Sequence, residues 1–209
     1  MGRNVVGMQS ELPCLYLIRH GETTWSLSGQ HTGRTDIPLN VQGEQDARRL
    51  AERLRAVRFK RVFTSPLQRA RRTCELAEMD GVVEIEPDLA EWDYGDYEGQ
   101  RRVDIRKGRP GWNVFRDGCP HGESPTQVTE RADRLITRLR ALEGNIAIFS
   151  HGHFGRVLAA RWIGLQIRQA QHFLLSTASL SILGYGHNHV EEPAIVRWNT
   201  VDGDTFDRI

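Results

Sequence analysis

Two kinds of hydrophobic pattern alternate along this chain of 209 residues. Short apolar runs, typical of buried strands, are separated by longer stretches in which apolar residues recur every three or four positions, as on one face of a helix. We predict strands at residues 14–19, 61–65, 82–86, 145–150, 179–186 and 194–199. We predict helices at about residues 42–57, 66–78, 124–142 and 153–163. This alternation favours an α/β fold of three layers, α/β/α, with a mostly parallel central sheet covered on both faces.

Two of the predicted helices have start signals. Ser65 is a suitable N-cap for the second helix, and Pro66 is a suitable first helical residue. The segment 124–127, Ser-Pro-Thr-Gln, matches a capping box with proline at the first helical position. The helix that it opens is expected to face the core with Val128, Ala132, Leu135, Ile136, Leu139 and Leu142.

The segment 88–122 follows neither pattern. It is rich in Gly, Trp and Asp, and only one short helix, near 101–107, is predicted within it. An irregular segment of this length in a compact domain is usually functional.

Composition and charge indicate an ordinary globular domain. From the length we expect one domain over residues 1–209, with its core at about 14–200. The 39% apolar and 26% charged residues are ordinary for a globular protein. The net charge is +1 and arginines alternate with Asp and Glu on the helices, so we expect no nucleic-acid partner. Any anion site must be local.

Cysteine usage and hydropathy suggest the cellular setting. The three cysteines have no metal-ligand spacing, which fits a reducing cytoplasm, and we expect no metal and no other cofactor. No stretch approaches the roughly 20 apolar residues of a membrane span, and the first residues lack the apolar region of a signal peptide. We therefore expect a cytoplasmic protein that does not bind a membrane.

The candidate chemistry lies where two predicted strands end. Strand 14–19 ends at Arg19 and leads directly into His20-Gly21, and strand 145–150 leads into His151-Gly152. Arg69 lies one turn into the helix that follows a third strand. Ligands of open α/β sheets bind beyond the carboxyl ends of the strands. Two histidines and two arginines could thus converge on a small anion, with phosphate as the first candidate.

Each of these residues also has a structural interpretation. A single histidine at a strand end is more often a hydrogen-bonded structural residue, and a single arginine on a helix more often faces solvent. The pair His151 and His153 could suggest a metal site. However, no carboxylate or cysteine cluster accompanies the pair, and a strand-to-helix junction directs the two side chains different ways. The coincidence of two His-Gly strand ends with the arginines favours the anion site.

Such a pocket suits phosphoryl transfer, which needs positioning and charge stabilisation. Histidine can be the nucleophile, and nearby guanidinium groups lower its pKa and keep it neutral at pH 7. An acid must protonate the leaving oxygen, and Glu91, at the mouth of the irregular segment, is the candidate. The residues alone do not separate Glu91 from its competitors, which are Glu22, Glu98 and Glu123.

Four motifs resemble those of the histidine phosphatase superfamily, also called phosphoglycerate mutase-like. They are RHGET at 19–23, SPLQRARRT at 65–73, LAEWDYGDYEG at 89–99 and SHGH at 150–153. The resemblance spans residues 14 to 190 and implies a phosphoglycerate mutase-like fold with His20 as the phosphorylated nucleophile. It further implies a phosphate pocket completed by Arg19, Arg69 and His151, with Glu91 as proton donor and a backbone contact from Gly152.

The loops are most similar to those of fungal sedoheptulose-1,7-bisphosphatase-like phosphatases, over 25–39 and 111–124. Ser26 stands where glycolytic mutases carry an asparagine, and the lid insertion is shorter than in those mutases. A shorter lid should protect a phosphohistidine from water less well. The matching positions that imply substrate contacts are Ser26, Thr32, Gly33, Tyr94 and Arg102.

The resemblance thus implies a metal-independent phosphatase whose partner is a small phosphorylated substrate, a sugar phosphate or bisphosphate. Two alternatives stay open at this point: a phosphoglycerate mutase-type isomerase, and a binding protein that holds a phosphorylated ligand without catalysis. A homodimer also stays open, since 179–186 could be a buried strand or a dimer edge.

Overall fold

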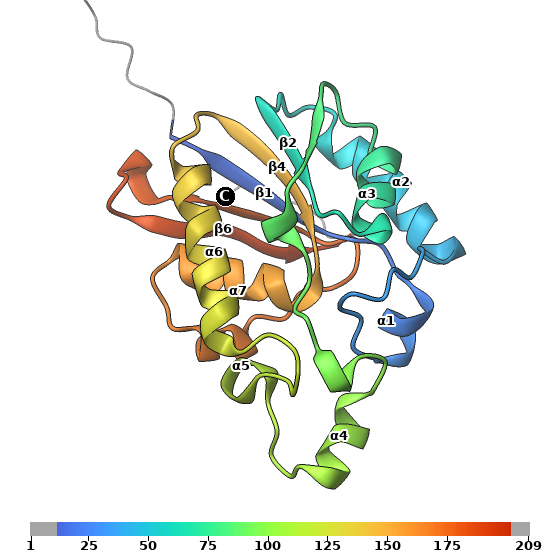
Figure 1. The fold of residues 1–209 in the computed structure, drawn as a ribbon. Helices are drawn as coiled ribbons and strands as arrows, with labels where there is room; N and C mark the ends of the chain where they lie inside the picture. Colours follow the sequence, from blue (N-terminus) through green and yellow to red (C-terminus); the bar gives the residue numbers. More distant parts are fainter. Residues whose placement is uncertain (1–11, 202–209) are drawn as a thin grey trace, which may run out of the picture.

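The computed structural model describes residues 12–201, which form a six-stranded sheet between two layers of helices (Figure 1). The strands are β1 (Cys14–Arg19), β2 (Arg61–Thr64), β3 (Val83–Ile85), β4 (Asn145–Ser150), β5 (Leu180–Tyr185) and β6 (Pro193–Thr200). Their order is β3-β2-β4-β1-β5-β6. The pairs β1–β4, β2–β4 and β2–β3 are parallel, whereas β5 is antiparallel to both neighbours. The predicted α/β fold is confirmed, and because β5 is an inner strand, it is not a dimer edge.

The helices divide between the two faces of the sheet. They are α1 (Thr24–Ser28), α2 (Val41–Leu54), α3 (Gln68–Leu76), α4 (Arg102–Gly108), α5 (Val114–Asp117), α6 (Pro125–Arg140) and α7 (Gly152–Trp162). One buried cluster joins α2 and α3 to the sheet, and the other joins α6 and α7 to the opposite face. Alternate residues of one strand serve both clusters, as Leu17 and Ile18 of β1 do. This two-sided burial explains why the inner strands appear in the sequence as continuous apolar runs.

The predicted start of the second helix is wrong. The helix α3 begins at Gln68 with Leu67 as its N-cap, not at Ser65-Pro66. The Ser65 hydroxyl lies 2.7 Å from the His151 ring and also accepts from the Leu67 N–H, at 3.3 Å, so it bonds just before the helix rather than capping its first turn. A carboxylate from a distant loop takes over the capping, since Asp36 Oδ1 accepts from the Gln68 N–H at 2.8 Å.

The capping box of α6 is confirmed. The Ser124 hydroxyl accepts from the Gln127 N–H, and the Gln127 side chain accepts from the Ser124 N–H at 2.8 Å. Five of the six expected core residues are buried on this helix; Leu142 lies just beyond its end and is partly buried.

The segment 88–122 is more ordered than its sequence suggests. It contains short 3₁₀ turns at Pro87–Leu89 and Gly95–Tyr97, the predicted short helix as α4, and α5, which the sequence did not predict. Its aromatic residues Trp92, Tyr94, Trp112 and Phe115 are buried. Hydrogen bonds from Trp92 Nε1 to the Glu123 carbonyl and from Trp112 Nε1 to the Gly118 carbonyl, each 2.9 Å, join distant parts of the segment to each other and to its end. The segment therefore has a defined conformation beside the carboxyl ends of β1 and β4.

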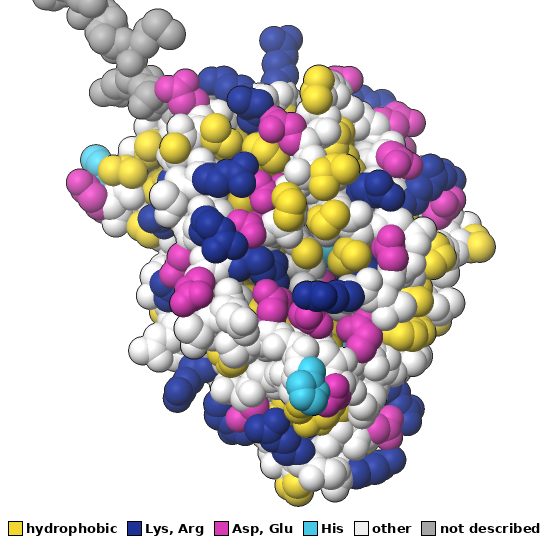
Figure 2. Space-filling view, viewed as in Figure 1, with side chains coloured by type: hydrophobic (Ala, Val, Ile, Leu, Met, Phe, Trp, Pro, Cys, Tyr) yellow, Lys and Arg dark blue, Asp and Glu magenta, His cyan; other side chains and the backbone are white. Residues whose placement is uncertain are grey.

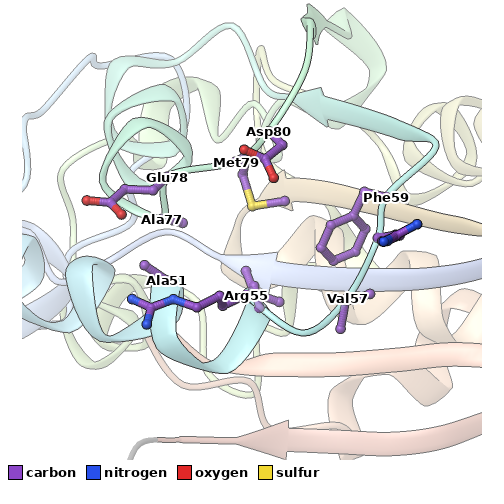
Figure 3. Close-up of a pocket in the computed structure, with 10 residues that line it drawn as sticks. Ala51, Arg55, Val57, Phe59, Ala77, Glu78, Met79 and Asp80 are labelled. Atoms are coloured by element: carbon purple, nitrogen blue, oxygen red, sulfur yellow. The ribbon is translucent and has the colours of Figure 1, made fainter.

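A large hollow lies at the other end of the parallel strands (Figure 3). It has a volume of about 610 Å³ and lies between the C-terminal ends of α2 and α3 and the chain that leads into β2. Its lining combines apolar side chains, among them Phe59 and Met79, which point toward one another, with charged ones. The charged groups Arg55 and Glu78 lie at its rim.

The surface carries no dominant charge. On the face in Figure 2, basic and acidic side chains are interspersed rather than gathered by sign. Within residues 12–201, no helix is both long and apolar enough to cross a bilayer. The N-terminal segment and the C-terminal tail, including the predicted lack of a signal-peptide region, lie outside the described residues.

Candidate active site

A smaller pocket of about 180 Å³ lies at the carboxyl ends of β1 and β4, where the sequence places the candidate chemistry. Its walls come from the end of β1, from α1 and the loop after it, from the segment around residue 91, and from the start of α7. The predicted residues Arg19, His20, Glu91 and Gly152 all line it. Parallel strands β1 and β4 pair through Arg19 and Ser150, so the residues that follow each strand emerge side by side.

His20 is held in the form that a nucleophile requires. Its Nδ1 lies 2.7 Å from the Gly21 carbonyl oxygen. Because a carbonyl only accepts, Nδ1 carries the proton and Nε2 keeps its lone pair. Burial lowers the pKa of His20 well below its usual value, and Arg69 and Arg19 lower it further. The arginine effect agrees with the prediction from sequence, but burial, which that prediction left out, is the larger cause.

Arg19 has donors left for an anion. Nη1 donates to the Leu175 carbonyl oxygen at 2.5 Å, whereas Nε is sealed from solvent and has no partner among residues 12–201. A buried guanidinium N–H without an acceptor is costly. Gly152 lies against this group: a Cβ there would be 3.2 Å from Arg19 Cζ. Because glycine has no Cβ, the guanidinium of Arg19 can pack directly against the backbone of Gly152.

Arg69 and His151 form a layer behind His20 and do not line the pocket. Arg69 is fully buried and donates Nε to His151 Nδ1 at 3.2 Å, Nη1 to the Thr35 carbonyl, and Nη2 to the Thr32 and Gly33 carbonyls. One of its five N–H donors is left.

The proton on His151 follows from these contacts. Since Arg69 donates to His151 Nδ1, the histidine proton is on Nε2 and is donated to the Ser65 hydroxyl. Burial and then Arg69 lower the pKa of His151 well below its usual value, so the ring stays neutral. The rings of His20 and His151 lie 5.2 Å apart. Direct contact of Arg69 or His151 with phosphate stays a prediction.

The structure separates Glu91 from the competing acids. Glu22 accepts from the Asn40 amide, Glu98 accepts from the Gly33 and Thr35 N–H groups, and none of the competitors lines the pocket. Glu123 forms an ion pair with Arg131 at 2.8 Å. Only Glu91 among the four shares the pocket with His20.

Backbone N–H groups hold the Glu91 carboxylate. Oε1 accepts from the N–H groups of Trp92 and Phe154, both at 2.8 Å, and Oε2 accepts from His153 at 2.9 Å. Two of these donors belong to the first turn of α7, whose dipole favours a negative charge there. Oε2 has one bond fewer than Oε1, so it keeps a lone pair that can carry a proton.

Three of the predicted substrate contacts, Ser26, Thr32 and Tyr94, line the pocket. Gly33 does not line it. Its N–H donates to Glu98, and a Cβ there would lie 2.5 Å from the Trp92 carbonyl oxygen, so its role in this structure is close packing. Arg102 lines a neighbouring hollow of about 100 Å³.

Sequence reasoning missed three residues at the junction of these two hollows. His31, His153 and Arg156 line both. Arg156 lies one turn into α7, as Arg69 lies early in α3, so the rule that found Arg69 could have found it. Arg156 donates to the Ala170 and Gln171 carbonyls, and burial lowers its pKa to about 10. Nothing local in the sequence around His31 indicates its position.

The donor set does not resemble a metal centre. Across residues 12–201, no three or more His, Cys, Asp or Glu side chains are grouped so that they could hold a metal ion. His151 and His153 point different ways, as expected, since one bonds Ser65 and the other Tyr94.

Known proteins resemble this chain in sequence and structure. A family model described as the histidine phosphatase superfamily (branch 1) matches residues 15–201. An acid phosphatase of Mycobacterium tuberculosis is 40% identical over 177 residues, covering 83% of this chain and 87% of the relative. A sedoheptulose 1,7-bisphosphatase of Saccharomyces cerevisiae is 33% identical over an aligned length of 252 residues, covering 90% and 93%. The solved structure of a Mycobacterium tuberculosis open reading frame has a TM-score of 0.84 and 36% identity, covering 90% of this chain and 97% of that chain.

Proposed function

Because this chain belongs to the histidine phosphatase superfamily (branch 1), we propose that it is a metal-independent phosphatase of small phosphorylated metabolites that works through a phosphohistidine on His20. The observation that carries the proposal is the state of His20: a buried, neutral ring with Nδ1 held and Nε2 free. That ring lines one pocket with a guanidinium that has unused donors and with a carboxylate.

In the first step, His20 Nε2 attacks phosphorus in line with the leaving oxygen. The P–N bond forms while the P–O bond breaks, and the leaving oxygen takes the bonding pair and a proton from Glu91. Positive charge that develops on the imidazole is stabilised by the Gly21 carbonyl, to which Nδ1 donates. Arg19 stabilises the charge on the transferring oxygens.

In the second step, water attacks the phosphohistidine. Glu91, now a carboxylate held by three N–H groups, accepts the proton of the water. The P–N bond breaks, and its electron pair returns to Nε2. The enzyme then regains its resting form and releases inorganic phosphate.

For the substrate, we propose a sugar bisphosphate. The hollow beside the catalytic pocket contains Arg102, which has no ion-pair partner among the described residues. Burial and the like charge of Arg106 lower the pKa of Arg102, so an anion would stabilise its charged form. A second phosphate at Arg102 would give this arginine a partner. The name of the yeast relative supports the same substrate class.

Phosphate release in excess EDTA tests the proposal. Sedoheptulose 1,7-bisphosphate, fructose 1,6-bisphosphate and 3-phosphoglycerate are compared at equal concentration. Rapid release that favours a bisphosphate is the expected result. Loss of activity in EDTA that an added divalent ion restores would contradict the metal-free mechanism. Bisphosphoglycerate-primed interconversion of 3- and 2-phosphoglycerate, faster than hydrolysis, would establish the mutase-type isomerase instead.

A further inference from the structure

Two imidazole rings, those of His31 and His153, form part of the wall shared by the catalytic pocket and the Arg102 hollow. The rings are nearly parallel, with centroids 5.7 Å apart and an interplanar angle of 9°. Neither ring has a role in the phosphoryl transfer described above. A substrate that reaches from the catalytic pocket to Arg102 would pass them.

His31 presents a hydrogen-bond acceptor. Its Nδ1 lies 2.7 Å from the Gln100 carbonyl oxygen, so Nδ1 carries the proton and Nε2 has the lone pair. The ring is 8% exposed and is fixed edge-on by Tyr94 and Trp112, with centroids at 4.7 and 5.4 Å. The tautomer and the orientation are therefore both set by the protein.

His153 presents a donor. Its Nδ1 lies 2.5 Å from the Tyr94 hydroxyl, which has no other hydrogen-bond partner among residues 12–201. Since Nδ1 is the only acceptor that residues 12–201 offer this hydroxyl, the hydroxyl donates to Nδ1, and burial keeps it protonated by raising the pKa of Tyr94 well above its usual value. Nε2 of His153 must then carry the ring proton. Phe115 packs edge-on against the ring, with centroids 5.2 Å apart.

Both rings stay uncharged and open to a ligand. Burial lowers the pKa of His31 and of His153, and Arg156 lowers that of His153 further. Neither Nε2 has a partner among the described residues, yet neither is sealed from solvent. One neutral acceptor and one neutral donor thus lie side by side on the wall.

We propose that His31 Nε2 and His153 Nε2 form a subsite for the hydroxyl groups of a polyol phosphate, with His31 accepting one hydrogen bond and His153 donating another. This inference rests on the proposed phosphatase function. A hydroxyl both donates and accepts, whereas an ionised phosphate or carboxylate only accepts and would face the lone pair of His31. The subsite therefore selects carbon chains with hydroxyls between the two anionic ends of a substrate.

The test compares erythritol 4-phosphate with butyl phosphate, which has the same chain length and no free hydroxyl. We expect the wild-type protein to favour the polyol in kcat/KM by about tenfold or more, because removing a substrate hydroxyl leaves the site's polar groups unpaired. His31→Phe keeps a planar ring without nitrogens and should lower this ratio about tenfold. His31→Gln, whose amide oxygen can accept from a hydroxyl, should recover part of the preference and so separates recognition from packing.

His121→Asn is the matched control. His121 belongs to the segment 88–122, which also contains Tyr94 and Phe115; its side chain is 85% exposed, and it pairs with Asp96 away from the pocket. Its backbone φ of 55° suits asparagine. The substrate ratio should not change in this variant.

The outcomes separate the subsite from the phosphatase function. If the wild-type protein hydrolyses both compounds equally well, or if His31→Phe keeps the wild-type ratio, the subsite is overturned while the phosphatase function stands. If the wild-type protein hydrolyses neither these compounds nor any of the three metabolites above, the phosphatase function fails and the subsite fails with it.

Discussion

The two hollows at opposite ends of the parallel strands differ in size and in whether their ionisable side chains are exposed or buried. The remote one, at the ends of α2 and α3, has more than three times the volume of the catalytic one. Its lining mixes apolar side chains with charged ones, and Arg55, one of the charged ones, is exposed (Figure 3). The catalytic pocket instead buries His20 and has Arg19 Nε sealed without a partner. Unused donors and perturbed histidines therefore mark the active site better than volume does.

Among the substitutions that leave the His20 nucleophile in place, Glu91→Gln is expected to cause the largest change. The glutamine oxygen can accept from Trp92 and Phe154, but its NH₂ group would face the His153 N–H, and it cannot supply a proton. We expect kcat to fall by about 100-fold to 1,000-fold with alkyl phosphates, whose leaving oxygens need the proton most. The fall should be smaller with p-nitrophenyl phosphate. Equal losses on both substrates, in initial-rate assays, would argue against an acid role for Glu91.

Gly152→Ala should have the next largest effect. The new methyl group would lie 3.2 Å from Arg19 Cζ, so the guanidinium would have to shift by a few tenths of an ångström. Because small misplacements of positioning groups are costly, we expect kcat/KM to fall roughly tenfold to 100-fold. Gly108→Ala in α4, where a Cβ would meet nothing within 4 Å, is the matched control. Similar kinetics in the two variants would show that the Arg19 contact at Gly152 does not matter.

A smaller effect concerns stability at low pH. Burial is the largest cause of the lowered pKa values of His20, His151 and His153. Below about pH 6.5 these histidines are protonated in the unfolded chain but stay neutral in the folded protein. The free energy of unfolding therefore decreases as the pH falls. We expect Tm to drop from pH 7 to 5, and to drop less in His20→Asn. An identical pH slope in that variant would contradict the assignment of a lowered pKa to His20.

The smallest effect is expected in the remote hollow. Arg55 is exposed at its rim, far along the strands from His20. Arg55→Ala should change kcat/KM by less than about twofold and the free energy of unfolding by about 0.5 kcal/mol at most. Gly108→Ala is measured alongside as a control. A larger loss of activity in Arg55→Ala would mean that the two hollows are coupled, and it would contradict the view that only the smaller pocket serves catalysis.

The sequence predicts that the residues after β1 and β4 lie together, for a topological reason. Residues that follow parallel neighbouring strands must emerge together, so His20 and His151 could be placed side by side without coordinates. Glu91 could be proposed but not separated from its competitors, because its selection depends on N–H groups of α7, about 60 positions later. Contacts between distant segments decide such cases.

The errors have the same origin. Ser65 looked like a helix cap because its local sequence allows it, but the bond to His151 and the capping by Asp36 come from elsewhere in the chain. His31 was missed because its loop shows no pattern, and only the packing of Tyr94 and Trp112 gives the ring its place. Arg69 was found, yet its role behind His20 depends on carbonyl groups of the loop that holds Thr32.

The most direct test of the account is to trap the phosphoryl group on the protein. Substrate labelled in its phosphate is mixed with enzyme, quenched within milliseconds under alkaline conditions and digested, and the labelled peptide is sequenced by mass spectrometry. The account predicts label on His20, and loss of both label and turnover in His20→Ala, while His189→Ala at an exposed turn behaves like the wild type. Label on another residue, or near-normal turnover in His20→Ala, would contradict it.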